Sequence, residues 1–109
     1  GCISDHDQII AASGPDQREY LGKTISRELE QAIIERESIC AGRNEKEFIP
    51  ATQDDRLDTA CQVIVPIISA GDAIGSVVLL GKNTGQKMGE TEQKLAMAAS
   101  LFLGKQMEQ

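Results

Sequence analysis

Two runs of apolar, mostly β-branched residues on either side of Gly71-Asp72 constrain the fold of this chain more than any other feature. The first run begins at Val63 and the second ends at Leu80. Short apolar runs that flank a Gly-containing pair are typical of a β-hairpin, because the tight turn requires a positive φ angle that glycine adopts without strain. The second run also contains Gly75, and a glycine inside a strand indicates that another part of the structure approaches closely. The sequence therefore predicts an antiparallel hairpin at the centre of a small α/β (α+β) domain.

The size and charge of the chain exclude several classes of function. Its 109 residues are the length of one domain, so we expect a single unit over residues 1–109. A formal net charge of −6 and an aromatic content of 3% argue against direct nucleic-acid binding, which draws on clustered Lys and Arg and on stacking. No apolar run approaches the roughly 20 residues that cross a bilayer, and the first residues lack the pattern of a secretory signal. We therefore expect a soluble, cytoplasmic chain with no membrane partner.

Further elements complete the predicted sheet and its helices. Residues 2–13 are predicted to form a second hairpin with its turn at residues 5–8, followed by a polar loop that includes residues 16–20. A helix with Thr24 or Ser26 as its N-cap comes next, because apolar residues recur there at helical spacing. Short strands are predicted at residues 39–41 and around Phe48-Ile49, and a last helix at residues 90–109.

The last predicted helix has apolar residues on more than one side. Leu95, Ala98, Ala99 and Phe102 form one stripe, which we expect to face the core. Met97, Leu101 and Met107 lie off that stripe. A helix with two apolar faces usually packs against two partners, so we expect these three residues to contact an equivalent helix of another subunit in a homo-oligomer.

Two short motifs imitate chemical sites. Gly22-Lys23-Thr24 matches the end of a phosphate-binding loop, but Gln17 stands where that loop needs an earlier glycine, so we interpret the segment as a helix N-terminus. Asp5-His6-Asp7 offers three metal-ligand types, but adjacent side chains on a tight turn point apart. Because His6 is the only histidine, most nucleophilic triads are also excluded. We expect no metal, no cofactor and no enzymatic activity.

The central hairpin pattern, an apolar residue with Pro-Ile and then Gly-Asp-x-Ile-Gly-x-Val, is similar to that of GAF domains. Over its whole length the chain resembles the C-terminal GAF domains of the stage V sporulation protein T family of transcription regulators. The matching segments are residues 9–14, 20–26, 66–75, 88–90 and 104–109. The resemblance implies a GAF-like or PAS-like antiparallel sheet flanked by helices, in a regulatory and oligomerisation domain of a sporulation regulator. It also implies that DNA is bound only through an upstream domain that this fragment lacks.

Two alternative functions stay open. A stand-alone GAF sensor would bind an unidentified small molecule, and Arg43 and Arg56 are then the candidate anion anchors in the loops of residues 42–58. A redox enzyme similar to the free methionine sulfoxide reductases would use three cysteines. Cys2, Cys40 and Cys61 are too widely separated to match the close grouping of that family. Their odd number and spacing favour a reducing compartment, and we expect three buried thiols.

Overall fold

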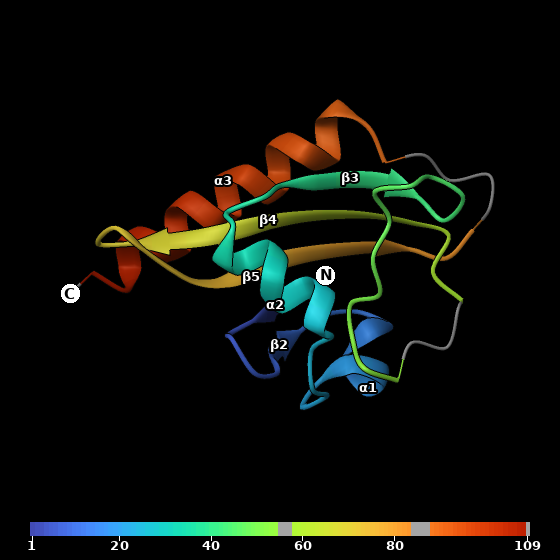
Figure 1. Cartoon of the computed structure of the whole chain (residues 1–109), viewed down its shortest axis with the longest axis horizontal. Coiled ribbons are helices and arrows are strands. Elements are labelled where there is room, and N and C mark those ends of the chain that lie inside the picture. Colours follow the sequence, from blue (N-terminus) through green and yellow to red (C-terminus); the bar gives the residue numbers. More distant parts are fainter. Residues whose placement is uncertain (55–57, 84–87, 109) are drawn as a thin grey trace.

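The computed structural model describes residues 1–54, 58–83 and 88–108, which form an antiparallel sheet between two layers of helices (Figure 1). The elements are β1 (Cys2–Ser4), β2 (Ile9–Ala12), α1 (Asp16–Tyr20), α2 (Arg27–Ile34), β3 (Ile39–Gly42), β4 (Cys61–Ser69), β5 (Asp72–Gly81) and α3 (Glu90–Gln106). The strands pair in the order β2-β1-β5-β4-β3, and every pairing is antiparallel. The predicted α+β class and the antiparallel sheet with flanking helices are therefore confirmed.

The central hairpin forms as predicted, but its turn lies one residue earlier. Ser69 pairs with Asp72, and the two residues between them, Ala70 and Gly71, have φ angles of 49° and 86°. A two-residue turn with positive φ at both positions matches the right-handed twist of the strands that it joins. Asp72 is thus the first residue of β5 rather than part of the turn.

Each face of the sheet carries its own core. Beneath α1 and α2 the cluster consists of Cys2, Ile9, Tyr20, Ile25, Leu29, Ala32, Ile33, Ile39, Ala41, Ala51, Ile64 and Val78. Beneath α3 the cluster is smaller and consists of Val63, Val65, Ile67, Val77 and Ala96, with Ala99 and Leu103 packed against it. Neighbouring residues of β4 and β5 point to opposite faces, so these central strands contribute to both cores.

The N-terminal half confirms most of the predicted elements. Residues 5–8 form the turn of the first hairpin, where the Asp5 carboxylate accepts hydrogen bonds from the backbone N–H groups of Asp7 and Gln8 at 2.7 and 2.8 Å. Ser26, one of the two predicted caps, begins α2 by accepting a 2.9 Å bond from the backbone N–H of Leu29. Residues 16–20 were predicted as loop, but they form the short helix α1 directly after Pro15, a residue compatible with a helix start.

The predicted strand around Phe48-Ile49 does not form. Instead, the backbone of Ile49 is held by one side chain: its N–H donates to Gln62 Oε1 at 3.0 Å, and its C=O accepts from Gln62 Nε2 at 2.8 Å. Gln62 lies in β4 and is fully buried. A buried amide therefore satisfies the backbone groups that a neighbouring strand would otherwise have satisfied.

The orientation of α3 differs from the prediction. Leu95 and Phe102 were expected in the core, but they are 62% and 63% exposed, and Ala98 is exposed as well. The buried residues of the helix are small: Ala96, Ser100 and Gly104. A Cβ atom at Gly104 would overlap the carbonyl oxygen of Ile68 in β4, so α3 lies too close to the sheet for larger side chains on that side.

Gly75 confirms the prediction of a close approach. A Cβ atom there would overlap the carbonyl oxygen of Ser4 on the neighbouring strand β1. The approach is to β1 rather than to a helix, and it allows the first hairpin to join the central one. Nearby, the hydroxyls of Ser4 and Ser76 are hydrogen-bonded at 2.6 Å in the buried interior.

Candidate functional site: an exposed helix face and an acidic groove

The side of α3 that points away from the sheet exposes large apolar side chains, beside the exposed Lys94 and Lys105. We call it the outer face of α3 and define it by the exposed residues Leu95, Met97, Leu101 and Phe102 of the helix, together with the exposed Met107 that directly follows it. In Figure 1, α3 runs along one face of the sheet, and none of the other helices or strands that the structure describes covers its far side. Several large apolar side chains exposed together on a folded domain are typical of a site of interaction. The residues Met97, Leu101 and Met107, which were predicted to contact a partner, are all exposed, and Leu95 and Phe102 extend the same surface.

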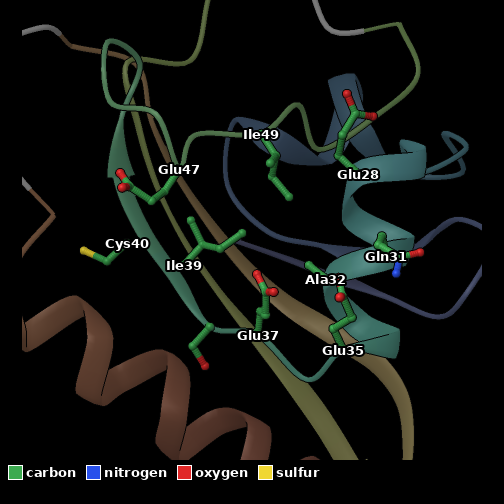
Figure 2. A pocket seen from close by; sticks show the side chains of 10 residues that line it. Glu28, Gln31, Ala32, Glu35, Glu37, Ile39, Cys40, Glu47 and Ile49 are labelled. Atoms are coloured by element: carbon green, nitrogen blue, oxygen red, sulfur yellow. The ribbon is translucent and has the colours of Figure 1, made fainter.

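An open groove lies on the other face of the sheet, between α2 and the edge strand β3. Its volume is about 540 Å³, within the range of small-molecule sites. The groove is lined by Glu28, Gln31, Ala32, Glu35, Glu37, Ser38, Ile39, Cys40, Glu47 and Ile49. Figure 2 shows Ile39 and Ile49 between β3 and α2, with glutamates around them. We call this cavity the acidic groove.

Within the part of the chain that the structure describes, no cationic side chain lines the acidic groove, although Arg36 lies between two of its glutamates in the sequence. Arg36 has a positive φ of 59° and donates a hydrogen bond to the carbonyl oxygen of Gly71, in the turn between β4 and β5. Its guanidinium therefore binds the turn at the end of the central hairpin. The four glutamates of the groove have no ion pair with the described part of the chain.

Arg43, one of the two predicted anion anchors, does not line this groove. Arg43 follows β3, where its Nε donates to the carbonyl oxygen of Thr59 at 2.7 Å. Its guanidinium carbon lies 4.4 Å from the centre of the Phe48 ring, a cation–π contact. Arg56 lies outside the described residues. Arg43 thus joins the two ends of the connection between β3 and β4, and the groove is defined by carboxylates that sequence reasoning did not single out.

The cysteines occupy three different environments. Burial, with a smaller contribution from the nearby Asp16 carboxylate, raises the pKa of the Cys2 thiol to about 11. Burial also raises the pKa of the Cys61 thiol. Cys40 was expected to be buried but is exposed on the edge strand β3, where its Sγ donates to the carbonyl oxygen of Met88 at 3.4 Å. Raised thiol pKa values disfavour the thiolate that nucleophilic cysteine chemistry requires.

The residues of the two motifs that resemble a metal site and a phosphate-binding loop make contacts within the fold. His6 Nε2 lies 2.7 Å from the carbonyl oxygen of Ala73, and Lys23 forms an ion pair with Asp54. Gly22 adopts a φ of 82°, and its N–H donates to the carbonyl oxygen of Ile9 at 2.9 Å, so this segment closes against β2. Across residues 1–54, 58–83 and 88–108, no group of three or more His, Cys, Asp or Glu side chains could hold a metal ion.

Comparisons with known proteins give the class and then the family of the chain. The sequence model described as "Stage V sporulation protein T C-terminal, transcription factor" matches residues 1–108, so the class is that of a transcription-factor domain. Stage V sporulation protein T of Bacillus subtilis (strain 168) is 36% identical over 107 residues, which are 98% of this chain and 58% of that protein. The chain belongs to the family of stage V sporulation protein T C-terminal domains. Within the described residues, none of the helices has the length and apolar character to cross a membrane.

Proposed function

We propose that this chain is a regulatory and oligomerisation domain of a sporulation transcription regulator and that it self-associates through the outer face of α3. The observation that carries the proposal is that α3 leaves large apolar side chains exposed on the side that faces away from the sheet. Small residues pack it against β4, while large apolar residues are exposed on its outer face. Large apolar side chains exposed together on one helix are typical of an interaction site.

The size of the exposed side chains supports a stable contact. Burying one Leu, Met or Phe side chain contributes roughly 1.5–3 kcal/mol, and a two-fold symmetric contact would bury the outer face of both copies. Association costs about 4–15 kcal/mol in lost translational and rotational freedom. Several such side chains from each copy are therefore sufficient to drive self-association of a helix pair.

The charge of the domain supports an indirect role in DNA binding. The net charge of −6 opposes contact with phosphates, so we assign DNA binding to a separate domain of the regulator. The present domain would then act by fixing how the DNA-binding domains are arranged, or by changing that arrangement when an effector binds. We also infer a cytoplasmic location, because a bacterial transcription regulator acts where its DNA is.

The test of self-association is the Leu101→Glu variant. Leu101 is 65% exposed, so the substitution leaves the fold of one copy intact but introduces an unpaired charge into the contact. We expect analytical ultracentrifugation to show dissociation relative to the unaltered chain. Ile34→Glu is the matched control, because Ile34 is an exposed apolar residue of α2, on the opposite face of the sheet. An unchanged oligomer in Leu101→Glu, or equal dissociation in Ile34→Glu, would exclude the outer face of α3.

A second part of the proposal is that the domain binds a small-molecule effector in a GAF-like manner. The acidic groove supports this part, because it has the size of a ligand site and an apolar floor. The alternative of a redox enzyme has less support, since burial disfavours the thiolates of Cys2 and Cys61.

A further inference from the structure

We propose that the acidic groove binds a linear aliphatic polyamine, with ammonium groups against its glutamates and the methylene chain on its apolar floor. This inference rests on the proposed effector role and names the chemical class of the effector. It replaces the sequence-based expectation of an anionic ligand held by arginines.

The charge of the groove favours a cation. Glu28, Glu35, Glu37 and Glu47 lie along its rim, and among the described residues no Lys, Arg or His lines it. The nearest arginine in sequence, Arg36, donates to the Gly71 carbonyl instead. Figure 2 shows Glu35 and Glu37 at the same end of the groove, so a cation bound there would lie near two carboxylates.

The floor of the groove favours an organic cation over a metal ion. Ala32, Ile39 and Ile49 supply apolar surface between the glutamates. Hard metal ions require several converging oxygen ligands, and the described residues provide no such cluster of three. An alkyl ammonium satisfies both features, because its methylene groups cover apolar surface while its charged end contacts a carboxylate.

The spacing of the glutamates favours a linear ligand with separated charges. Glu28 lies in the first turn of α2, and Glu35 caps its C-terminal end. Seven residues of α-helix at 1.5 Å per residue separate them by about 10 Å. Figure 2 accordingly shows Glu28 at one end of the groove and Glu35 with Glu37 at the other. An extended chain with an ammonium group at each end spans that distance.

The test is a calorimetric titration of spermidine into the chain at low salt, because spermidine carries ammonium groups at both ends of an aliphatic chain. We expect saturable binding that weakens at least about tenfold in the double variant Glu35→Gln, Glu37→Gln, which loses two charge contacts. The matched control is Glu30→Gln, in the same helix but outside the groove, with an affinity within about twofold of the unaltered chain. No saturable binding, or an equal loss in Glu30→Gln, would overturn the proposal.

Two further ligands separate the contributions of charge and apolar surface. We expect octane-1,8-diol, which lacks the charges, not to bind, and Mg²⁺, which lacks the chain, to bind far more weakly than spermidine. Mg²⁺ binding as tight as that of spermidine would show that charge alone acts, and it would overturn the proposal. Sedimentation of the same samples without spermidine tests self-association separately, so that failure of the polyamine site is distinguishable from failure of the oligomerisation domain.

Discussion

The helices on the two faces of the sheet are built in opposite ways. α2 points its large apolar residues Leu29 and Ile33 into the core and its charged residues outward. α3 fully buries only small residues and packs Leu103 partly against the core, but it leaves most of its large apolar residues exposed on the outer side. The first helix is thus complete within one copy of the chain, whereas the second leaves its larger apolar side chains without a partner. The comparison teaches that large residues identify the buried side of a helix only when the helix axis lies at an ordinary distance from the sheet.

The largest expected effect compares one leucine from each helix. Leu29 in α2 is fully buried, so Leu29→Ala should lower the free energy of unfolding by about 2–5 kcal/mol through lost burial and a cavity. Leu101→Ala in α3 should change it by less than about 0.5 kcal/mol in dilute, dissociated protein. Urea denaturation monitored by circular dichroism measures both. Similar losses in the two variants would show that the helices are not built differently.

A prediction with a smaller expected effect tests why α3 has its observed orientation. Replacing glycine by alanine inside a helix normally stabilises by about 1 kcal/mol. Gly104→Ala should instead destabilise by about 1–3 kcal/mol, because the added Cβ overlaps the Ile68 carbonyl and forces α3 away from β4.

Gly42→Ala in β3 is the control for this prediction. A Cβ atom there would lie 3.5 Å from Glu45 Oε1, which is an ordinary contact, so little change is expected. A rise in melting temperature for Gly104→Ala would contradict the close approach of α3 to the sheet.

The smallest expected effect compares thiols from the two sides of the sheet. The pKa of Cys2, in the core beneath α1 and α2, is raised from 9.0 to about 11. The folded state therefore favours the neutral thiol, and its contribution to stability is complete below pH 9 and is lost as the pH rises toward 11. Cys2→Ala should reduce the slope of unfolding free energy against pH in this interval. Cys40→Ala, at the exposed position, should leave the slope unchanged, and an unchanged slope in Cys2→Ala would contradict the burial of that thiol.

The elements that were predicted correctly have strong local signals. The hairpin of β4 and β5 follows from two β-branched runs around a glycine, and α2 follows from a serine cap and a regular apolar stripe. The orientation of α3 could not be predicted in this way, because it depends on the approach of Gly104 to a carbonyl in β4. Likewise, no local pattern around Phe48-Ile49 indicates that a glutamine in another strand takes the role of a partner strand.

Of the two candidate functional surfaces, the outer face of α3 was predicted in part from the sequence and the acidic groove was not. Met97, Leu101 and Met107 were singled out because they lie off the main stripe, and their exposure agrees with that prediction. Whether they contact a partner stays a prediction. The acidic groove could not be predicted, because its glutamates belong to α2, to the residues before β3 and to the loop after it, and only folding brings them together.

The two hydrogen bonds between the Gln62 side chain and the Ile49 backbone also affect how tightly a ligand would bind in the acidic groove. Two hydrogen bonds to a fully buried amide hold the backbone of Ile49 in the floor of the groove. Ordering a flexible residue on binding costs about 1–2 kcal/mol in conformational entropy. Because this part of the floor is already ordered, a ligand would not incur that cost at Ile49, and more of its contact energy would appear as affinity.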